Sequence, residues 1–408
     1  MEFVKKYKKY FSDMILNMIG FAIYIVAQQI LLLPILAKSV TDEVYAVIVL
    51  YLSILNVVCN VTGGELGNVR LVMDSEYKKD SLRGDFARIL LLLSPIITII
   101  LFPLFIFLGY SKLGSIALIL TILMANIRLY STCYYRLEKE FNKVIIQNLC
   151  YLCGIILSLI AFIFCKNIYL ILFIPELISL VYALKNSDLL KMKLNKTKEI
   201  KNTIKKFGEL GFVSLLTNLM NYIDKFLIYP ILGTTSVAVY YAVNSMSKIV
   251  SLITNPMSSV VLSWISNIND SKKKNKIIKM TMCVNIPIVI IVAIISIPLT
   301  YLALKILYSQ YLVDAMILIV PISIITAFGT ASTLTKSVLL KFSNTKKLMF
   351  IYMGYFVLFA ILAYNLSKSN GLLGFAYSNL ISRIVLWISF IILLVTAKEG
   401  ENNVEIIK

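Results

Sequence analysis

Polar side chains that could bind ions stand inside long apolar stretches of this sequence, where charge is rare. A guanidinium can bind two phosphate oxygens at once, a lysine ammonium acts as a point charge, and a carboxylate can take up a proton or a metal cation. The candidates for anion binding are Arg128, Lys225, Lys248, Arg383 and Asn244, and the candidates for ion coupling are Asp224 and Glu176.

The charges expected near the middle of a membrane do not balance. Arg128, Lys248 and Arg383 provide three cations against the carboxylate of Glu176. A charge at the bilayer centre costs about 2.5–3.5 kcal/mol on insertion scales unless it faces water or a partner. The surplus indicates an interior cavity that attracts an anion. The alternative for Glu176 is a fixed ion pair with Arg128 or another cation.

Asp224 and Lys225 are neighbours in the sequence, so their side chains do not face one another on a helix. We therefore expect each of them to need a different partner. Asn126, Asn218 and Asn221 lie near the charged positions and would complete a polar lining.

The residues of most enzyme and metal sites are missing. The sequence has no histidine, which removes the usual zinc ligand and proton shuttle. Its six cysteines lie within or at the rim of apolar stretches, which is typical of small core residues. It has no phosphate-binding glycine-rich motif and no aspartate-rich nucleotide-sugar motif. We expect no enzyme activity and no cofactor apart from a coupling ion, H+ or Na+.

The candidate residues are held by apolar segments long enough to cross a bilayer. The chain of 408 residues is 59% apolar, with a mean hydropathy of +0.85. About 20 apolar residues in a helix span the hydrocarbon layer, and inside lipid a helix satisfies its own backbone hydrogen bonds. The expected spans are 12–36, 43–64, 88–109, 115–136, 146–165, 168–185, 208–230, 238–262, 281–304, 313–338, 348–365 and 373–396.

Basic residues alternate between the loops and fix the orientation. Most of the 40 lysines and arginines lie at the two ends and in the even-numbered loops. The odd-numbered loops carry only Lys38, Lys112, Lys166, Lys305 and Lys368. Positively charged loops stay in the cytoplasm, so we expect the protein in a bacterial plasma membrane with both termini on the cytoplasmic side. The net charge is +19, and the basic residues beside the spans would contact anionic lipid head groups. We therefore expect membrane lipids rather than nucleic acid as partners.

The two halves of the chain resemble one another. When the sequence is aligned with itself so that Pro34 matches Pro230, the Ile-Leu pairs that follow also match, and Tyr45-Ala46 aligns with Tyr241-Ala242. This indicates an all-α membrane protein of twelve transmembrane helices, in two six-helix bundles related by a pseudo-two-fold axis along the membrane normal. The expected domains are an N-terminal bundle over 1–185, a basic cytoplasmic linker or amphipathic helix over 186–207, and a C-terminal bundle over 208–408.

One segment of the sequence, NYIDKFLIYPILGTTSVAVYYAVNSMSKI at 221–249, carries a family resemblance. It resembles the seventh span of polysaccharide flippases of the Wzx type, in the multidrug/oligosaccharidyl-lipid/polysaccharide exporter (MOP) superfamily. That span typically reads Asp-Arg, then Leu-Gly, then Gly-x-Tyr-x-x-Ala. The matching positions are Asp224, Lys225, Leu232, Gly233, Tyr240 and Ala242, with Lys225 in place of arginine and Ala238 in place of the second glycine.

A further likeness is YYRLEKEFNK at 134–143, where the family often has an arginine-rich turn. The family's glycine-containing pattern in the first half is absent between Leu36 and Ala46, so this chain departs from the family there.

The resemblance implies a MATE-like fold and a lipid-linked cargo. Such proteins move undecaprenyl-diphosphate-linked oligosaccharide units from the cytoplasmic to the outer leaflet by alternating access, in the synthesis of O-antigen and other surface polysaccharides. A polymerase and other assembly proteins would be partners, and coupling to an ion gradient would make the protein an antiporter.

Other transporters with similar layouts remain alternatives. A small-molecule or drug exporter of the same superfamily usually has a buried carboxylate in its first helix, whereas this chain has Asp13 only at the edge. A major-facilitator transporter is less favoured, because its Asp-Arg-Gly-Arg loop signature is absent. A polysaccharide polymerase is less favoured, because it usually has a long outer loop.

Overall fold

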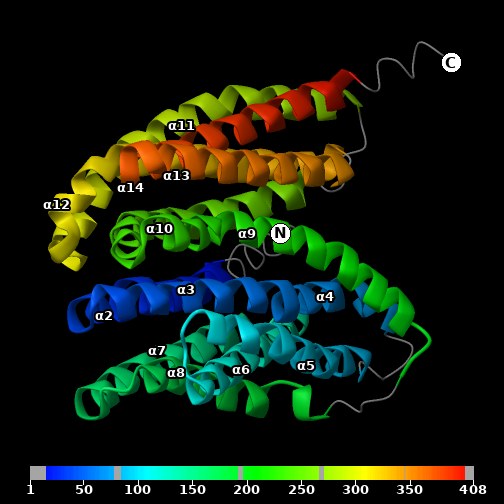
Figure 1. Cartoon of the computed structure of the whole chain (residues 1–408). Helices are drawn as coiled ribbons and strands as arrows, with labels where there is room; N and C mark the ends of the chain where they lie inside the picture. Colours follow the sequence, from blue (N-terminus) through cyan, green and yellow to red (C-terminus); the bar gives the residue numbers. More distant parts are fainter. Residues whose placement is uncertain (1–14, 78–83, 192–195, 266–270, 344, 400–408) are drawn as a thin grey trace. The chain divides into compact units, whose positions relative to one another are not determined.

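The computed structural model describes residues 15–77, 84–191, 196–265, 271–343 and 345–399. Every regular element in these residues is a helix, and they contain no strand (Figure 1). Within the described part, nine helices are long and apolar enough to cross a membrane. The predicted class, an all-helical multi-pass membrane protein, is therefore confirmed, whereas the number of twelve spans stays a prediction.

The first half of the chain begins with a helical stretch, Ile15–Ser39, that contains a π-helical turn at Ala27–Leu32 and ends in α2, Leu33–Ser39. The second span is α3, a π-helical turn at Asn60–Gly64 and α4 in succession. The remaining bounds in this half are α3 Asp42–Cys59, α4 Glu65–Tyr77, α5 Gly84–Phe107, α6 Lys112–Leu137, α7 Phe141–Cys165 and α8 Ile168–Asn186.

In the second half, two of the expected spans, 208–230 and 238–262, fall in helices that are not among the nine. Helix α9 begins inside the predicted linker and continues into the expected seventh span, so the linker is partly helical. The bounds are α9 Ile200–Leu232, α10 Thr234–Ile265, α11 Ser271–Leu307, α12 Leu312–Ala315, α13 Ile319–Phe342 and α14 Thr345–Glu399. Residues 192–195 of the linker lie outside the described part.

The long helix α14 contains the last two expected spans. Its backbone leaves helical geometry at Asn370 and at Gly371, where φ is +55°. Glycine adopts this left-handed conformation without the steric cost that a Cβ atom would bring. The break lies in the predicted gap between 365 and 373, so α14 is two helical segments in sequence.

The chain divides into two compact units. Unit 1 comprises the residues up to Leu32 together with Tyr51–Leu219, and unit 2 comprises Leu33–Leu50 together with Met220–Lys408. The predicted domain boundaries at 185 and 208 stay a prediction. Each unit is described separately below.

Close approach of helices holds unit 1 together. Helix α8 packs against α6 and α7, and α6 also contacts α4 and α5. Gly154 in α7 lies so close to α8 that a Cβ atom there would be 2.5 Å from Cα of Pro175. At Gly63 a Cβ atom would be 2.3 Å from the backbone oxygen of Asn126. These glycines bring backbones together, and small residues have this role in many membrane helix interfaces.

Ion pairs and hydrogen bonds attach the segment after α8 to unit 1. The guanidinium of Arg70, 1% exposed, pairs with Asp188, and its Nη1 lies 3.3 Å from Oδ1 of that residue. The carboxylate of buried Asp85 accepts hydrogen bonds from the hydroxyl and from the backbone N–H of Thr197, the latter at 3.0 Å. The stretch between α8 and α9 is therefore held by α4 near its start and by α5 near its end.

In unit 2, α13 packs against α10, α11 and α14. The side-chain amide of Asn285 joins α11 to α13 and to α14. Its oxygen accepts hydrogen bonds from the hydroxyl of Thr335 at 3.0 Å and from the indole N–H of Trp387 at 3.1 Å. A buried amide that is bonded in this way fixes the relative rotation of the helices.

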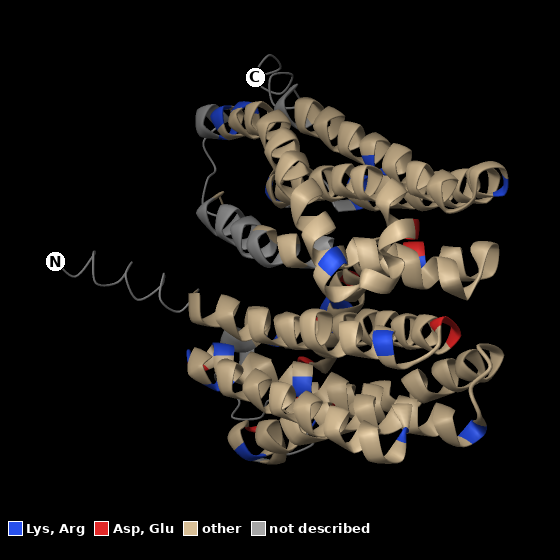
Figure 2. Cartoon of the chain, turned by 90° about the vertical axis from the view of Figure 1, so that its left-hand side faces the viewer, with Lys and Arg blue, Asp and Glu red and all other residues tan. Residues whose placement is uncertain are grey.

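The outer faces of both units are apolar. Helix α5 exposes Ile99 and Ile100 by 73% and 60%, and α11 exposes Ile294 by 65%. Long stretches of the helices carry neither Lys and Arg nor Asp and Glu (Figure 2). Faces of this kind are suited to contact with lipid chains, because they have no charge to desolvate.

Candidate functional site

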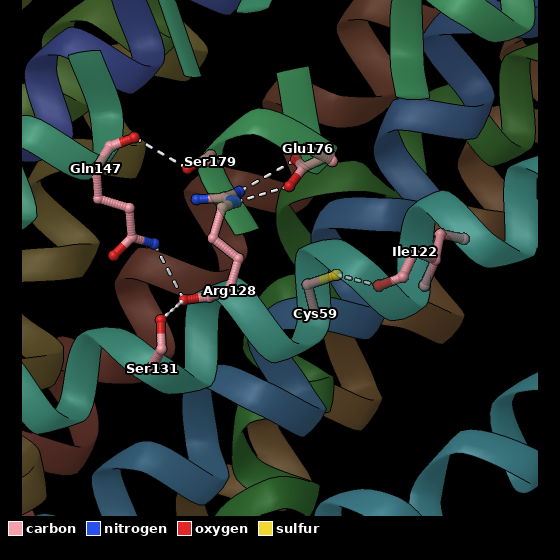
Figure 3. Close-up of polar contacts among 7 residues, drawn as sticks. All are labelled: Cys59, Ile122, Arg128, Ser131, Gln147, Glu176 and Ser179. Carbon is pink, nitrogen blue, oxygen red and sulfur yellow. Dashed lines mark hydrogen bonds and ion pairs between the residues drawn. The ribbon is translucent and has the colours of Figure 1, made fainter. Parts of the chain in front are cut away.

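In unit 1 the buried charges Arg128 and Glu176 form a closed ion pair between α6 and α8 (Figure 3). Nε of Arg128 lies 2.6 Å from Oε2 of Glu176, and Nη2 lies 3.1 Å from Oε1. The two side chains are only 6% and 2% exposed. This forked geometry engages both carboxylate oxygens, which is the strongest arrangement for an arginine and a carboxylate.

Aromatic rings and an amide surround this pair. The guanidinium carbon of Arg128 lies 5.1 Å from the ring centre of Tyr24 and 5.2 Å from that of Tyr151. The amide of Gln147 donates to the backbone oxygen of Arg128 at 3.2 Å, and Ser179 donates to the backbone oxygen of Gln147 at 2.9 Å (Figure 3). Cation–π contacts and a bidentate partner together compensate the buried guanidinium. The structure thus contains the fixed pair that the sequence offered as the alternative for Glu176.

In unit 2, Asp224, Lys225 and Asn244 come together. Oδ1 of Asp224 accepts hydrogen bonds from Nζ of Lys225 at 2.7 Å and from its backbone N–H at 3.0 Å. Oδ2 accepts from the amide of Asn244, in α10, at 2.8 Å. Asp224 and Lys225 are both buried in the structure.

The expectation that Asp224 and Lys225 need different partners is wrong. Their Cβ atoms diverge on α9, but the flexible four-carbon stem of the lysine reaches back to its neighbour. The lysine head also lies 5.7 Å from the ring centre of Tyr222 and 5.8 Å from that of Tyr241.

The second half of α14 contributes two more polar side chains to unit 2. Asn379, 3% exposed, donates to the hydroxyl of Tyr240 at 2.8 Å. One turn further, Nη2 of Arg383 donates to the backbone oxygen of Met220 at 3.0 Å, and its guanidinium carbon lies 5.5 Å from the ring centre of Tyr355.

We call Asp224, Lys225, Tyr240, Asn244, Asn379 and Arg383 the unit 2 polar cluster. Arg383 bonds the backbone of Met220, which lies one turn before Asp224 on α9, and Asn379, one turn before Arg383, bonds Tyr240, so these groups lie close together. Among the described side chains Arg383 has no carboxylate partner, and its Nε–H is buried without an acceptor. Two cations and one carboxylate therefore leave the cluster with a positive surplus.

The structure brings four of the seven predicted residues together in the unit 2 polar cluster and joins Arg128 to Glu176 in unit 1. Lys248 lies in α10, but its side chain is outside the described ones. Arg128 and Arg383 belong to different units, so a common chamber stays a prediction. The substrate-binding and ion-coupling roles of all seven residues also stay predictions.

Unit 1 contains a polar cavity of about 250 Å³ that the sequence did not predict. Its polar lining includes Asn60, Glu65, Asn68, Thr132, Arg136 and Asn218. Asn218 was expected to complete a polar lining, whereas Arg136 had no assigned role. Arg136 belongs to the segment YYRLEKEFNK, but it lies in the last turn of α6, where a basic side chain is common at the end of a span, so the burial of its Nε–H could not be predicted.

No family model matches this sequence, and no curated protein matches it. Solved structures do match over nearly the whole chain. An inward-facing multidrug resistance MATE family transporter of the MOP superfamily has a TM-score of 0.69 and 14% identity, covering 93% of this chain and 95% of its own. The lipid II flippase MurJ, in an inward closed conformation, has a TM-score of 0.69 and 16% identity, covering 95% of this chain and 87% of its own.

A third similar structure is a MOP superfamily transporter from Pyrococcus furiosus, described as having a binding pocket of reverse polarity. It has a TM-score of 0.69 and 16% identity and covers 95% of this chain and 94% of its own. At these identities the likeness establishes the fold. The chain has the fold of membrane transporters of the MOP superfamily.

Proposed function

We propose that this protein is a transporter that moves a lipid-linked oligosaccharide, joined to its lipid by a diphosphate, from the cytoplasmic to the outer leaflet of a bacterial plasma membrane. The shared fold supports transport, and one of the proteins with this fold is a lipid II flippase. The observation that carries the choice of cargo is the positive surplus of the unit 2 polar cluster, in which Asp224 and Lys225 are buried and Arg383 is partly buried.

Three groups of the cluster would bind the diphosphate. Arg383 has an unused buried Nε–H and would bind phosphoryl oxygens, while Lys225 and Asn244 would add donors. Lys248 and Arg128 are further candidates from the sequence. Binding of the head group would favour one access state, and a gradient of H+ or Na+ would reset the transporter. Asp224 or Glu176 would be the coupling residue, and an incoming ion would have to displace Lys225 from Asp224 or Arg128 from Glu176.

An exporter of cationic drugs ranks second. Such a cargo needs an available buried carboxylate, but in the cluster Oδ1 of Asp224 is occupied by Lys225 and Oδ2 by Asn244. A cation would have to displace the lysine first. The same contacts leave an anion free to approach the donors of Arg383.

The test is a comparison of Arg383→Gln with Lys305→Gln, which removes a charge from an exposed side chain in α11 of the same unit. In proteoliposomes containing a fluorescent undecaprenyl-diphosphate sugar, Arg383→Gln should slow movement of the label between leaflets at least tenfold, and Lys305→Gln should not. In the source bacterium, Arg383→Gln should remove surface polysaccharide at an unchanged protein level. Equal flipping by both variants, or ethidium export that depends on Arg383, would overturn the proposed function.

A further inference from the structure

The polar cavity of unit 1 has the composition of a ligand site. It is lined by the first helix, by the π-helical turn and α4, by α6 and by the part of α9 in unit 1. Its volume of about 250 Å³ is below the ~300–1,000 Å³ typical of pockets for drug-sized ligands. It can therefore enclose one small polar group and not an oligosaccharide.

Arg136 is the unsatisfied group in this cavity. Its Nε–H is buried and has no acceptor. Its one described contact is with the ring of Phe21, whose centre lies 5.5 Å from the guanidinium carbon. The C-terminal end of α6 attracts a cation, but that field does not supply a hydrogen-bond acceptor. A guanidinium whose Nε–H is removed from water, and which has no carboxylate partner among the described residues, is best compensated by an anionic ligand.

The rest of the lining favours an anion that also carries hydroxyl groups. Glu65 contributes a carboxylate, which repels a bare anion but accepts hydrogen bonds from hydroxyls. Amides of Asn60, Asn68 and Asn218 supply both donors and acceptors. Asn60 donates to Asn218 at 3.1 Å, and the amide nitrogen of Asn68 lies 3.4 Å from Oε2 of Glu65.

The backbone holds this lining in place. The π-helical turn Asn60–Gly64 leads directly into α4, and Thr62 donates to the side chain of Asn126 at 2.7 Å. Gly67 lies against α6, where a Cβ atom would be 3.2 Å from Cβ of Cys133. Turns of π-helix are frequent at functional sites, because they change which side chains face a given direction.

We propose that this cavity binds a small phosphate ester that carries hydroxyl groups, with Arg136 at the phosphoryl oxygens and Glu65 and the asparagines at the hydroxyls. The identity of the ligand rests on the proposed function: the first sugar of the lipid-linked cargo, with its adjoining phosphate, has this chemistry. The glycerol phosphate head group of a bilayer lipid has the same chemistry, so the test separates the two sources.

The experiment measures binding of glucose 1-phosphate, inorganic phosphate and glucose to the full chain in uncharged detergent, by titration calorimetry. Wild type should bind glucose 1-phosphate about tenfold more tightly than phosphate, because two or more hydrogen bonds are added. Arg136→Gln should weaken binding by about tenfold to a hundredfold. Lys139→Gln removes an exposed charge three residues away and should change the affinity less than twofold.

A second pair of measurements separates ligand binding from a structural role. Arg136→Gln should unfold at the wild-type temperature or above it, because a charge with no protein partner is removed. Glu65→Gln should bind phosphate more tightly while reducing the preference for glucose 1-phosphate. Equal loss in Arg136→Gln and Lys139→Gln, or no preference for the ester in wild type, would overturn the site.

The remaining outcomes separate this site from the proposed function. If Arg383→Gln abolishes binding and Arg136→Gln does not, the ester binds the unit 2 polar cluster and the inference about the cavity fails. If Arg136→Gln abolishes binding of glucose 1-phosphate while Arg383→Gln leaves flipping intact, the ligand site in the cavity is supported and the proposed function fails. Phosphatidylglycerol in nanodiscs that displaces glucose 1-phosphate would overturn the assignment to the cargo, and lack of displacement would support it.

Discussion

The buried charges of the two units differ in how completely they are paired. In unit 1, Arg128 and Glu176 join two helices, use both carboxylate oxygens and lie between two tyrosine rings. In unit 2, Asp224 bonds its own neighbour Lys225, while Arg383 bonds a backbone oxygen and keeps an unused Nε–H. The charges of the Arg128–Glu176 pair cancel in unit 1, whereas the unit 2 polar cluster has two cations and one carboxylate.

This difference separates two uses of an intramembrane charge. A pair that engages all of its atoms holds helices together and leaves nothing for a ligand. A guanidinium that bonds only one carbonyl is already largely desolvated in the folded protein, and its remaining N–H groups can bind a ligand. The sequence does not reveal which use applies, because Arg128, Glu176 and Arg383 are each single charges within an apolar stretch.

The largest effect should come from breaking the balanced pair. Glu176→Gln leaves the guanidinium of Arg128 buried without a counter-charge and should lower the free energy of unfolding by about 3–5 kcal/mol. Thermal unfolding of the purified chain in detergent measures the change. The double variant Arg128→Met/Glu176→Leu should recover most of this loss, because apolar side chains replace a buried pair at little cost. Equal stability of Glu176→Gln and wild type would show that the pair is not structural.

An intermediate effect should come from the helix contacts around this pair. Gly154→Ala places a Cβ atom 2.5 Å from Cα of Pro175 and should destabilise the protein by about 1–3 kcal/mol. Gly329 in α13 of unit 2 has open space around it, so Gly329→Ala is the matched control. Alanine favours the helix there and should leave stability unchanged or raise it by up to about 1 kcal/mol. The comparison fails if both alanines have the same effect on the unfolding temperature.

The smallest effect on stability should come from the partly paired cation. Arg383→Gln removes one hydrogen bond and one ring contact but also a buried N–H that lacks an acceptor. The net change in unfolding free energy should be below about 1 kcal/mol. A loss as large as that of Glu176→Gln would show that Arg383 is structural, and the distinction between the units would no longer hold.

Hydropathy was sufficient to predict most of the described helices, because a run of about 20 apolar residues has few other stable states in lipid, whereas α9 and α10 are not among the nine apolar ones. The gap before the last expected span coincides with the backbone break at Asn370 and Gly371. Other boundaries were not predictable. Helix α9 begins at Ile200, within a lysine-rich segment, because polar residues continue a helix easily once it leaves the membrane.

The candidate site was predicted only in part, because sequence spacing gives the direction of Cβ and not the reach of a side chain. For that reason the sequence predicts different partners for Asp224 and Lys225, although both of them and Asn244 are candidate site residues. Tyr240 and Asn379 pair across 139 residues of sequence, which no local pattern indicates. Arg136 was missed because, at a helix end, a buried guanidinium and a solvated one look alike in sequence.

The π-helical turn at Ala27–Leu32 has a consequence for the helix that contains it. Such a turn holds one residue more than an α-turn, so the side chains after Leu32 are rotated by about 100° from where an unbroken helix would place them. Removing a single residue inside the turn would return the helix to α geometry, and the side chains on either side of the turn would keep their directions about the helix axis. The segment can thus lose one residue while Tyr24 and Leu36 keep the directions they now have, a tolerance to deletion that regular stretches of the same helix lack.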